Sequence, residues 1–127
     1  MSEEIRQALL RGDVIDITTT GRRTGEARRI EVRLHNVDGQ LYISGSTPGK
    51  RSWYANVLAN PDFKVHLKRD LVADLDAYAM PVLQESERRR VFRVLLEATG
   101  RPEQLDDRLK GSPLVHVSVS LGEAGSG

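Results

Sequence analysis

Residues 30–44 have the sequence IEVRLHNVDGQLYIS, in which apolar and polar side chains alternate on both sides of a turn. Up to residue 35 every second side chain is apolar, which is the pattern of a half-buried strand. Asp38-Gly39 is a pair that tolerates the positive φ angles of a two-residue hairpin turn, and residues 41–44 form the return strand. The stretch therefore predicts an antiparallel hairpin, and its pattern recurs along the chain.

Outward from this hairpin, the chain shows further strand patterns and a few helical ones. The predicted strands are residues 13–20, 30–35, 41–44, 63–68, 72–80 and 115–120. The predicted helices are residues 2–11, 52–59 and 84–99, and residues 102–111 are expected to be an acidic-to-basic connector. Tight turns join four of the strands and leave no room for helical crossovers. The pattern predicts a mainly β fold, a six-stranded antiparallel barrel with flanking helices.

Length and composition limit the class of protein. A chain of 127 residues argues for one domain, expected over residues 1–121 with a flexible tail at 122–127. The absence of cysteine excludes disulfides, thiolate metal sites and cysteine nucleophiles. The three histidines have no metal-ligand spacing, and we interpret them as strand-surface residues. With no long apolar run and an acidic N-terminus, we expect a cytoplasmic protein without an integral membrane segment.

The net charge of +1 does not indicate nucleic-acid binding, but it hides a local excess of arginine. Between Gly21 and Arg33 there are five arginines against two glutamates. Two glycines bound the loop at residues 21–25, whose guanidinium groups and hydroxyl could bind a phosphate or a carboxylate. On composition alone, an ordinary polar turn is the commoner reading of this loop.

A second loop, residues 44–51, also has the composition of an anion site. It offers hydroxyls, glycine amides and two cations directly before a helix N-terminus, and all of these favour an anion. Trp53 follows at once. It can pack in the core under the helix, form an aromatic wall against a flat ring, or do both.

Two motifs at these loops resemble a known family. Residues 18–28, TTTGRRTGEAR, are similar to the TTxGRKTGxxR signature of the deazaflavin-dependent nitroreductase family. Residues 53–61, WYANVLANP, are similar to its WxxNLxANP helix. The resemblance implies a split β-barrel related to pyridoxamine-phosphate-oxidase-like flavoproteins. It also implies coenzyme F420, a deazaflavin with a phospholactyl-oligoglutamate tail. Reduced F420 would pass a hydride to a small electron acceptor such as a quinone, a nitroaromatic or another activated double bond.

Matching motif positions imply the residues of the cofactor site. The residues that would hold the anionic tail are Arg22, Arg23 and Thr24, with Arg28 nearby. Those expected beside the deazaflavin ring are Glu31, Val32 and Arg33 on one edge and Ser44, Ser46, Thr47 and Gly49 on the other, with Lys50 as a further cation. Trp53 and Asn56 would support the pocket. No catalytic residue is assigned, because the cofactor carries the hydride chemistry; the proton comes from solvent, Tyr54 or Tyr42.

Two other functions remain open at this point. An FMN-binding split-barrel oxidoreductase could use Arg22 and Arg23 for a single terminal phosphate. A module that carries a flavin or a lipid without turnover is the other alternative. The resemblance also implies a possible homodimer. The acceptor is left open, because residues 84–110 contain no aromatic residue except Phe92.

Overall fold

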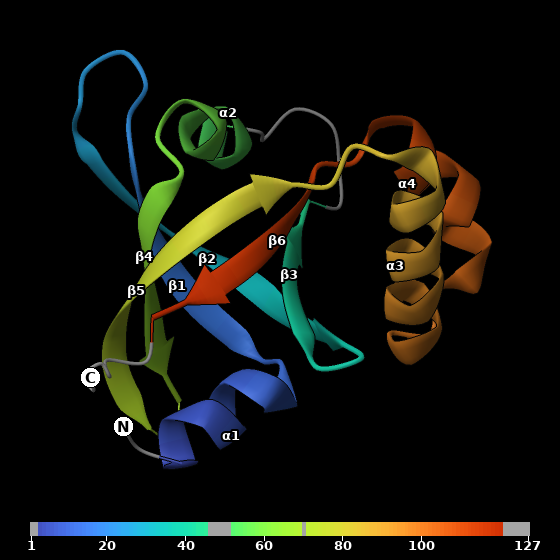
Figure 1. Cartoon of the computed structure of the whole chain (residues 1–127), viewed down its shortest axis with the longest axis horizontal. Coiled ribbons are helices and arrows are strands. Elements are labelled where there is room, and N and C mark those ends of the chain that lie inside the picture. The colour runs from blue at the N-terminus through green and yellow to red at the C-terminus, as the bar shows by residue number, and fades with distance from the viewer. Residues whose placement is uncertain (1–2, 46–51, 70, 121–127) are drawn as a thin grey trace.

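The structure is a computed structural model, and it describes residues 3–45, 52–69 and 71–120. Its centre is a closed barrel of six strands in the order β1-β2-β3-β6-β5-β4, with every neighbouring pair antiparallel (Figure 1). The strands are β1 (Val14–Thr20), β2 (Ala27–Val37), β3 (Gln40–Ser44), β4 (Asp62–Lys68), β5 (Val72–Pro81) and β6 (Leu114–Val119). The predicted antiparallel barrel is confirmed.

The predicted hairpin at residues 30–44 is present, with Asp38 and Gly39 at φ 54° and 83° in its turn. Strand β2 nevertheless begins at Ala27, three residues earlier than predicted, and pairs there with Thr20. The extra residues form a two-stranded ribbon that leaves the barrel. Both faces of β2 are exposed in this ribbon, so the alternation that marks a half-buried strand is missing there.

The barrel interior is filled by inward side chains from all six strands. Ile17, Ile43 and Val65 are among those completely buried. Full burial of such an aliphatic side chain stabilises a fold by about 1.5–3 kcal/mol. The alternation that predicted the strands thus reflects this interior, because every second residue of a strand points inward.

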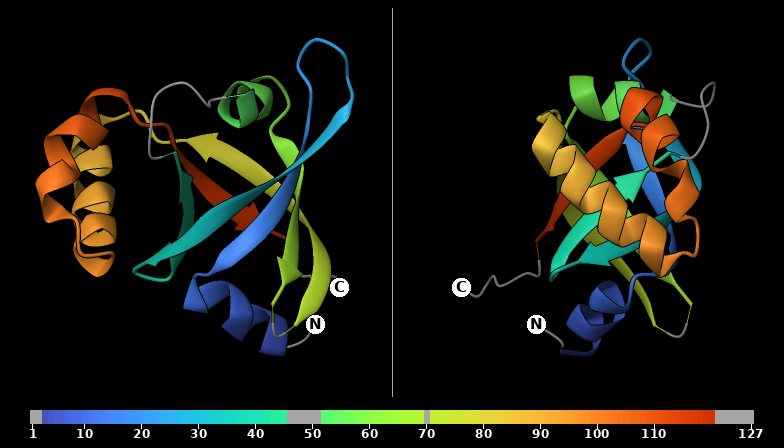
Figure 2. Two further views of the ribbon diagram at one scale, coloured as in Figure 1. Left: turned by 180° about the vertical axis from the view of Figure 1, so that it is seen from behind. Right: turned by 90° about the vertical axis from the view of Figure 1, so that its right-hand side faces the viewer.

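Helices close the barrel and extend it on one side. Helix α1 (Glu3–Arg11) covers one end, α2 (Ser52–Ala59) lies across the other, and α3 (Glu85–Ala98) stands beside the barrel (Figures 1 and 2). The three predicted helices are confirmed.

The predicted connector at residues 102–111 is wrong. It contains a short 3-10 turn (Pro102–Gln104) and a fourth helix, α4 (Leu105–Gly111), which packs against α3. Only Leu105 and Leu109 form its apolar face, and they join a second core cluster around Phe92. Two apolar residues one turn apart are too few to reveal a helical period.

Within residues 3–45, 52–69 and 71–120, no helix combines the length and the apolar character that crossing a membrane requires. The single domain over residues 1–121 stays a prediction. The tail expected at residues 122–127 lies outside the described residues.

Candidate functional site

A cleft of about 1250 Å³ runs along β2, between the loop that joins β1 to β2, helix α2 and the α3–α4 pair. It brings together all ten of the predicted site residues that the structure describes. These residues are Arg22, Arg23, Thr24, Arg28, Glu31, Val32, Arg33, Ser44, Trp53 and Asn56. The other four predicted residues, Ser46, Thr47, Gly49 and Lys50, lie outside the described residues.

The loop between β1 and β2 is a tight turn that presents its arginines at the end of the ribbon. The Gly21 N–H donates to the carbonyl of Glu26 at 2.8 Å, and the Gly25 N–H donates to the carbonyl of Gly21 at 2.9 Å. Gly25 has a φ of 75°, which side-chain-bearing residues rarely adopt. The two glycines therefore shape the turn and leave Arg22 and Arg23 exposed at its tip.

The side chain of Asn56, on α2, holds this loop in place through hydrogen bonds. Its side chain is only 4% exposed. Its Oδ1 accepts from the backbone N–H of Arg22 at 3.1 Å, and its Nδ2 donates to the Thr19 hydroxyl at 3.1 Å. A buried amide with both ends bonded holds its partners in one geometry. The asparagine in the helix motif thus acts by positioning the arginine loop of the other motif.

Trp53 fits both of its sequence-based interpretations. It is 7% exposed and belongs to the barrel core, where it meets the ring of Tyr54 edge-on at 5.7 Å between centroids. It also lines the cleft, next to Gly45. Core packing therefore holds this aromatic side chain rigidly in the cleft wall.

The cleft is strongly cationic. Six arginines line it, and Glu31 is its one acidic residue in the described part of the chain. The Glu31 carboxylate is already neutralised, because its Oε2 accepts from Lys68 Nζ at 2.6 Å. None of the six arginines has a carboxylate of the described residues within ion-pair distance. They are Arg22, Arg23, Arg28, Arg33, Arg101 and Arg108.

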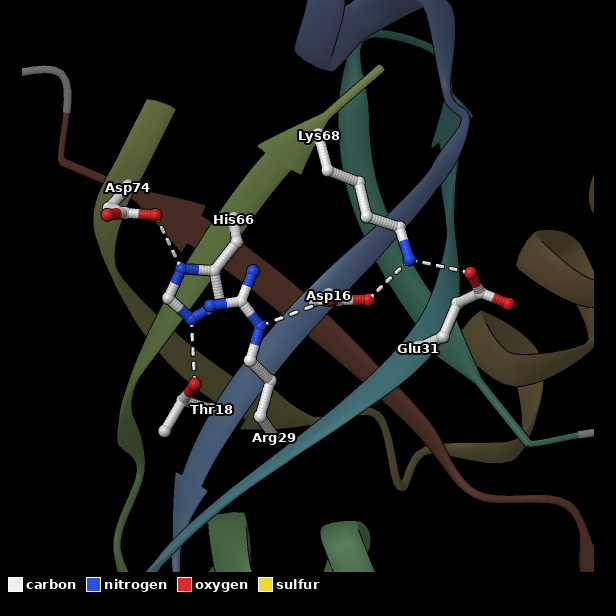
Figure 3. A network of polar contacts seen from close by, with 7 residues as sticks. All are labelled: Asp16, Thr18, Arg29, Glu31, His66, Lys68 and Asp74. Carbon is white, nitrogen blue, oxygen red and sulfur yellow. Dashed lines mark hydrogen bonds and ion pairs between the residues drawn. The ribbon is translucent and has the colours of Figure 1, made fainter. Parts of the chain in front are cut away.

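A network of ion pairs on the barrel surface binds charged side chains that are close to the cleft in sequence. Lys68 joins Glu31 of β2 to Asp16 of β1, and Arg29 donates to the same Asp16 carboxylate at 3.0 Å (Figure 3). These cations hold the pKa of Asp16 below its usual range, the Lys68 hydrogen bond being the largest cause. Arg29 is therefore a structural residue, whereas its neighbour Arg28 lines the cleft.

His66 does not fit the interpretation of the histidines as strand-surface residues. His66 is 7% exposed and lies between Thr18 and Asp74, with 2.7 Å from Nε2 to the Thr18 hydroxyl and 2.7 Å from Nδ1 to the Asp74 carboxylate (Figure 3). These two hydrogen bonds connect the side chains of three neighbouring strands, β1, β4 and β5. The described residues contain no cluster of side chains suited to a metal ion.

Sequence reasoning missed the far wall of the cleft. His35, Arg101 and Arg108 line it, together with Leu95, Ala98 and Thr99. Burial, with Arg33 and Arg108 nearby, lowers the pKa of His35 to about 4, so that its imidazole is neutral at physiological pH. His35 follows the polar alternation of a strand surface, and the helices that cover it were not apparent in that pattern. No signal in the sequence alone placed Arg101 and Arg108.

Neither tyrosine considered as a proton donor lines the cleft in the described part of the chain. Tyr42 is buried in the second core cluster, and burial followed by the charge of Glu87 raises its pKa. Tyr54 packs against the barrel core. We therefore assign the proton to neither of them.

Comparison with known proteins gives this geometry a family. The model of the family described as F420H(2)-dependent quinone reductase matches residues 2–119. This chain belongs to that family. Its cofactor is coenzyme F420, and it is an F420H2-dependent oxidoreductase of the quinone reductase type. The deazaflavin cofactor predicted from the two motifs is thereby confirmed.

Solved structures of low identity share the fold. An F420-H2 dependent reductase (FDR-A) has a TM-score of 0.60 and 24% identity, over 84% of this chain and 93% of that one. A putative pyridoxamine 5'-phosphate oxidase from Listeria innocua has a TM-score of 0.68 and 13% identity, over 93% and 92%. The predicted split barrel is thereby confirmed.

Two further structures differ in length or assembly. ChuZ from Campylobacter jejuni has a TM-score of 0.70 and 15% identity, and 93% of this chain spans about half, 52%, of that chain. A structure described as a domain-swapped dimer has a TM-score of 0.59 and 24% identity, over 93% of this chain and 95% of that one.

The charge and the apolar surface of the residues that line the cleft fit the two parts of F420, its anionic tail and its flat ring system. An anionic tail needs cations that the fold does not already neutralise, and the arginines of the β1–β2 loop have no carboxylate partner among the described residues. A flat ring system needs apolar surface, and Ile30, Val32 and Trp53 line the cleft beyond the loop.

A test of the loop geometry is the variant Asn56→Leu, which keeps the size of the side chain. It leaves the Thr19 hydroxyl and the Arg22 N–H without their partner. We expect the free energy of unfolding in urea to fall by about 1–3 kcal/mol and F420 binding to weaken, because the arginine loop loses its anchor. The matched change Asn60→Leu removes an amide whose contact with the carbonyl of Thr20 is long, 3.5 Å, and should cost less on both measurements.

Proposed function

We propose that the cleft along β2 binds F420 in one orientation, with the anionic tail at the β1–β2 loop and the deazaflavin ring beside residues 31–33. The observation that carries this proposal is the set of guanidinium groups at the loop end that have no carboxylate partner among the described residues, whereas Glu31, the acidic residue of the described cleft lining, is paired with Lys68. Thr24 adds a hydroxyl at the same end. Guanidinium groups bind phosphate and carboxylate bidentately, and both occur in this tail.

The protein's own contribution is binding, orientation and the exclusion of water. Bound reduced F420 supplies the hydride, so this chain needs no acid–base pair for that step. Trp53 holds one wall of the cleft rigid through its place in the core. Leu95 and Ala98 of α3 give the opposite wall an apolar surface against which a flat acceptor can lie.

We propose a quinone as the acceptor, because Val32 and Trp53 on one side of the cleft and Leu95 and Ala98 on the other offer apolar surface to a flat ring. A nitroaromatic or an enone has a similar flat shape. The rate of F420H2 oxidation with each of the three classes of acceptor shows which of them the protein prefers. The possible homodimer stays a prediction, supported by the dimeric structure of similar fold. The cytoplasmic location also stays a prediction.

Titration of the purified protein with F420 and with FMN tests the cofactor preference. We expect micromolar F420 binding, followed by cofactor fluorescence, and no FMN binding at the same concentrations. One phosphate on FMN engages fewer of the arginines than a phosphate with several carboxylates does. Binding of FMN without F420 would reject this assignment in favour of a flavin oxidoreductase.

Turnover separates an enzyme from a carrier. F420H2 mixed with the protein and a panel of quinones, nitroaromatics and enones should be oxidised fastest with the quinones, measured by recovery of the F420 absorbance. Heat-unfolded protein is the control. Tight F420 binding with no oxidation by any acceptor would favour a carrier.

A further inference from the structure

The end of the cleft opposite the arginine loop contains a second group of cations, formed by Arg33 of β2 with Arg101 and Arg108 at the α3–α4 pair. We call this group, with His35, the helix-side cluster. Arg28 near the loop end and Arg33 of the helix-side cluster are five residues apart on β2, which is about 17 Å at roughly 3.3 Å per residue. The two cationic ends of the cleft are therefore separate places.

Arg108 is the central residue of the helix-side cluster, and the fold leaves it poorly satisfied. Its side chain is half-buried. Its Nη1 lies 3.5 Å from the Ser44 hydroxyl and 3.5 Å from the carbonyl of Gly45, which is the outer limit for a hydrogen bond. Burial, followed by the charge of Arg101, lowers the pKa of its guanidinium. A half-buried cation beside another cation is stabilised by an anion between them.

Arg88 of α3 shows how the same helix pair treats a purely structural arginine. Its guanidinium donates to four backbone carbonyls at 2.8–3.3 Å, among them that of Ser112 at 2.8 Å. Those bonds tie α3 to the end of α4. Among the described residues, Arg108 of α4 has no such set of acceptors, and it lines the cleft instead. The contrast leaves the guanidinium of Arg108 available to an anion bound in the cleft.

The surroundings of Arg108 favour a ligand with both an acidic group and an apolar ring. His35 is neutral and can donate or accept a hydrogen bond. Leu95 and Ala98 add apolar surface in the same wall. In the described part of the chain, no carboxylate lies within ion-pair distance of Arg33, Arg101 or Arg108.

We propose that the helix-side cluster is a second anion-binding site, and that it selects an aromatic acceptor carrying an acidic substituent, such as a carboxylated quinone. This inference rests on the proposed function and narrows its substrate class. The F420 tail carries the same chemistry and is the competing source of the anion. The experiment below distinguishes the two.

The first arm measures binding without turnover. Isothermal titration calorimetry compares 2-naphthoate with 2-naphthamide, which has a similar shape but no charge, on the protein alone and on the protein saturated with F420. We expect naphthoate to bind at least tenfold more tightly in both forms. Equal binding of the two probes, or a preference that disappears when F420 is bound, would overturn the proposal, because the tail would then occupy the site.

Variants of α4 locate the site. Arg108→Gln should remove most of the naphthoate preference and leave the F420 dissociation constant unchanged, whereas Arg108→Lys, which keeps the charge, should retain much of the preference. Lys110→Gln, on the exposed part of the same helix, is the matched control and should behave as the unmodified protein. Circular dichroism verifies that each variant is folded. A tenfold or larger loss of F420 affinity in Arg108→Gln would assign Arg108 to the tail and overturn the proposal.

The second arm uses 1,4-naphthoquinone and a carboxylated derivative as acceptors. The carboxylated quinone should have the lower KM, and Arg108→Gln should raise that KM about tenfold while leaving the KM of the neutral quinone unchanged. A similar rise for both quinones would overturn the selectivity. Failure of the unmodified protein to reduce either quinone would reject the proposed function, whereas the naphthoate preference would still uphold the anion site.

Discussion

Replacing Arg22 and Arg23 together by alanine is expected to weaken F420 binding by roughly one hundredfold or more. Each lost hydrogen bond to a charged group costs about 1.5–3 kcal/mol, and both guanidinium groups lie at the tip of the β1–β2 loop without a carboxylate partner among the described residues. Because both are exposed, the loss should shrink as salt is added. Titration of F420 followed by fluorescence at two salt concentrations measures both effects.

Two controls show that the effect belongs to the tail. Arg29→Ala removes one arginine from strand β2 close to the loop, but Arg29 pairs with Asp16 outside the cleft, so F420 affinity should change little. A deazaflavin without the phospholactyl-glutamate tail should bind the double variant and the unmodified protein equally. If the double variant bound F420 normally, or lost the tailless compound as well, the tail would not lie at this loop.

Lowering the pH from 6.5 to 4 is expected to reduce the free energy of unfolding by up to about 3 kcal/mol through His35 alone. The pKa of His35 falls from 6.5 to about 4 in the folded protein, and each pH unit between these values is worth about 1.4 kcal/mol. The unfolded chain therefore takes up the proton first. The stability contributed by the neutral imidazole is complete above pH 6.5 and is lost as the pH falls towards 4.

Urea unfolding of the unmodified protein and of His35→Gln at several pH values isolates this contribution. Carboxylates whose pKa is lowered in the fold, such as Asp16, also reduce stability in acid, but they are present in both proteins and cancel in the difference. We expect the unfolding free energy of the unmodified protein to fall relative to that of His35→Gln as the pH decreases from 6.5 to 4. Curves that stay parallel would mean that His35 is solvated and titrates normally.

The barrel and the loop end of the site could be predicted from the sequence because both depend on local patterns. Strand alternation reflects which side chains point into the barrel, and the arginine and asparagine motifs are short segments with fixed spacing. Asn56 shows the limit of this reasoning. Its motif indicated a pocket residue, whereas its bonds to Thr19 and Arg22 depend on the packing of α2 against the ribbon.

The helix side of the cleft could not be predicted, because it depends on contacts between segments far apart in the chain. Helix α4 has only two apolar residues in its buried face, and Arg108 gains its environment from Ser44 and Arg101. His35 has the alternation of an exposed strand residue, and it is half-buried only because other elements cover it. The sequence also could not tell which arginines of the excess line the cleft. In the structure, Arg28 lines the cleft, whereas Arg29, on the other face of β2, pairs with Asp16.

The central claim is the orientation of F420 in the cleft, and a crystal structure of the complex with F420 tests it most directly. The account predicts the tail phosphate and carboxylates in contact with Arg22, Arg23 and Arg28, and the deazaflavin ring along β2 beside residues 31–33. Density for the tail at Arg101 and Arg108, or for the whole cofactor outside this cleft, would contradict it.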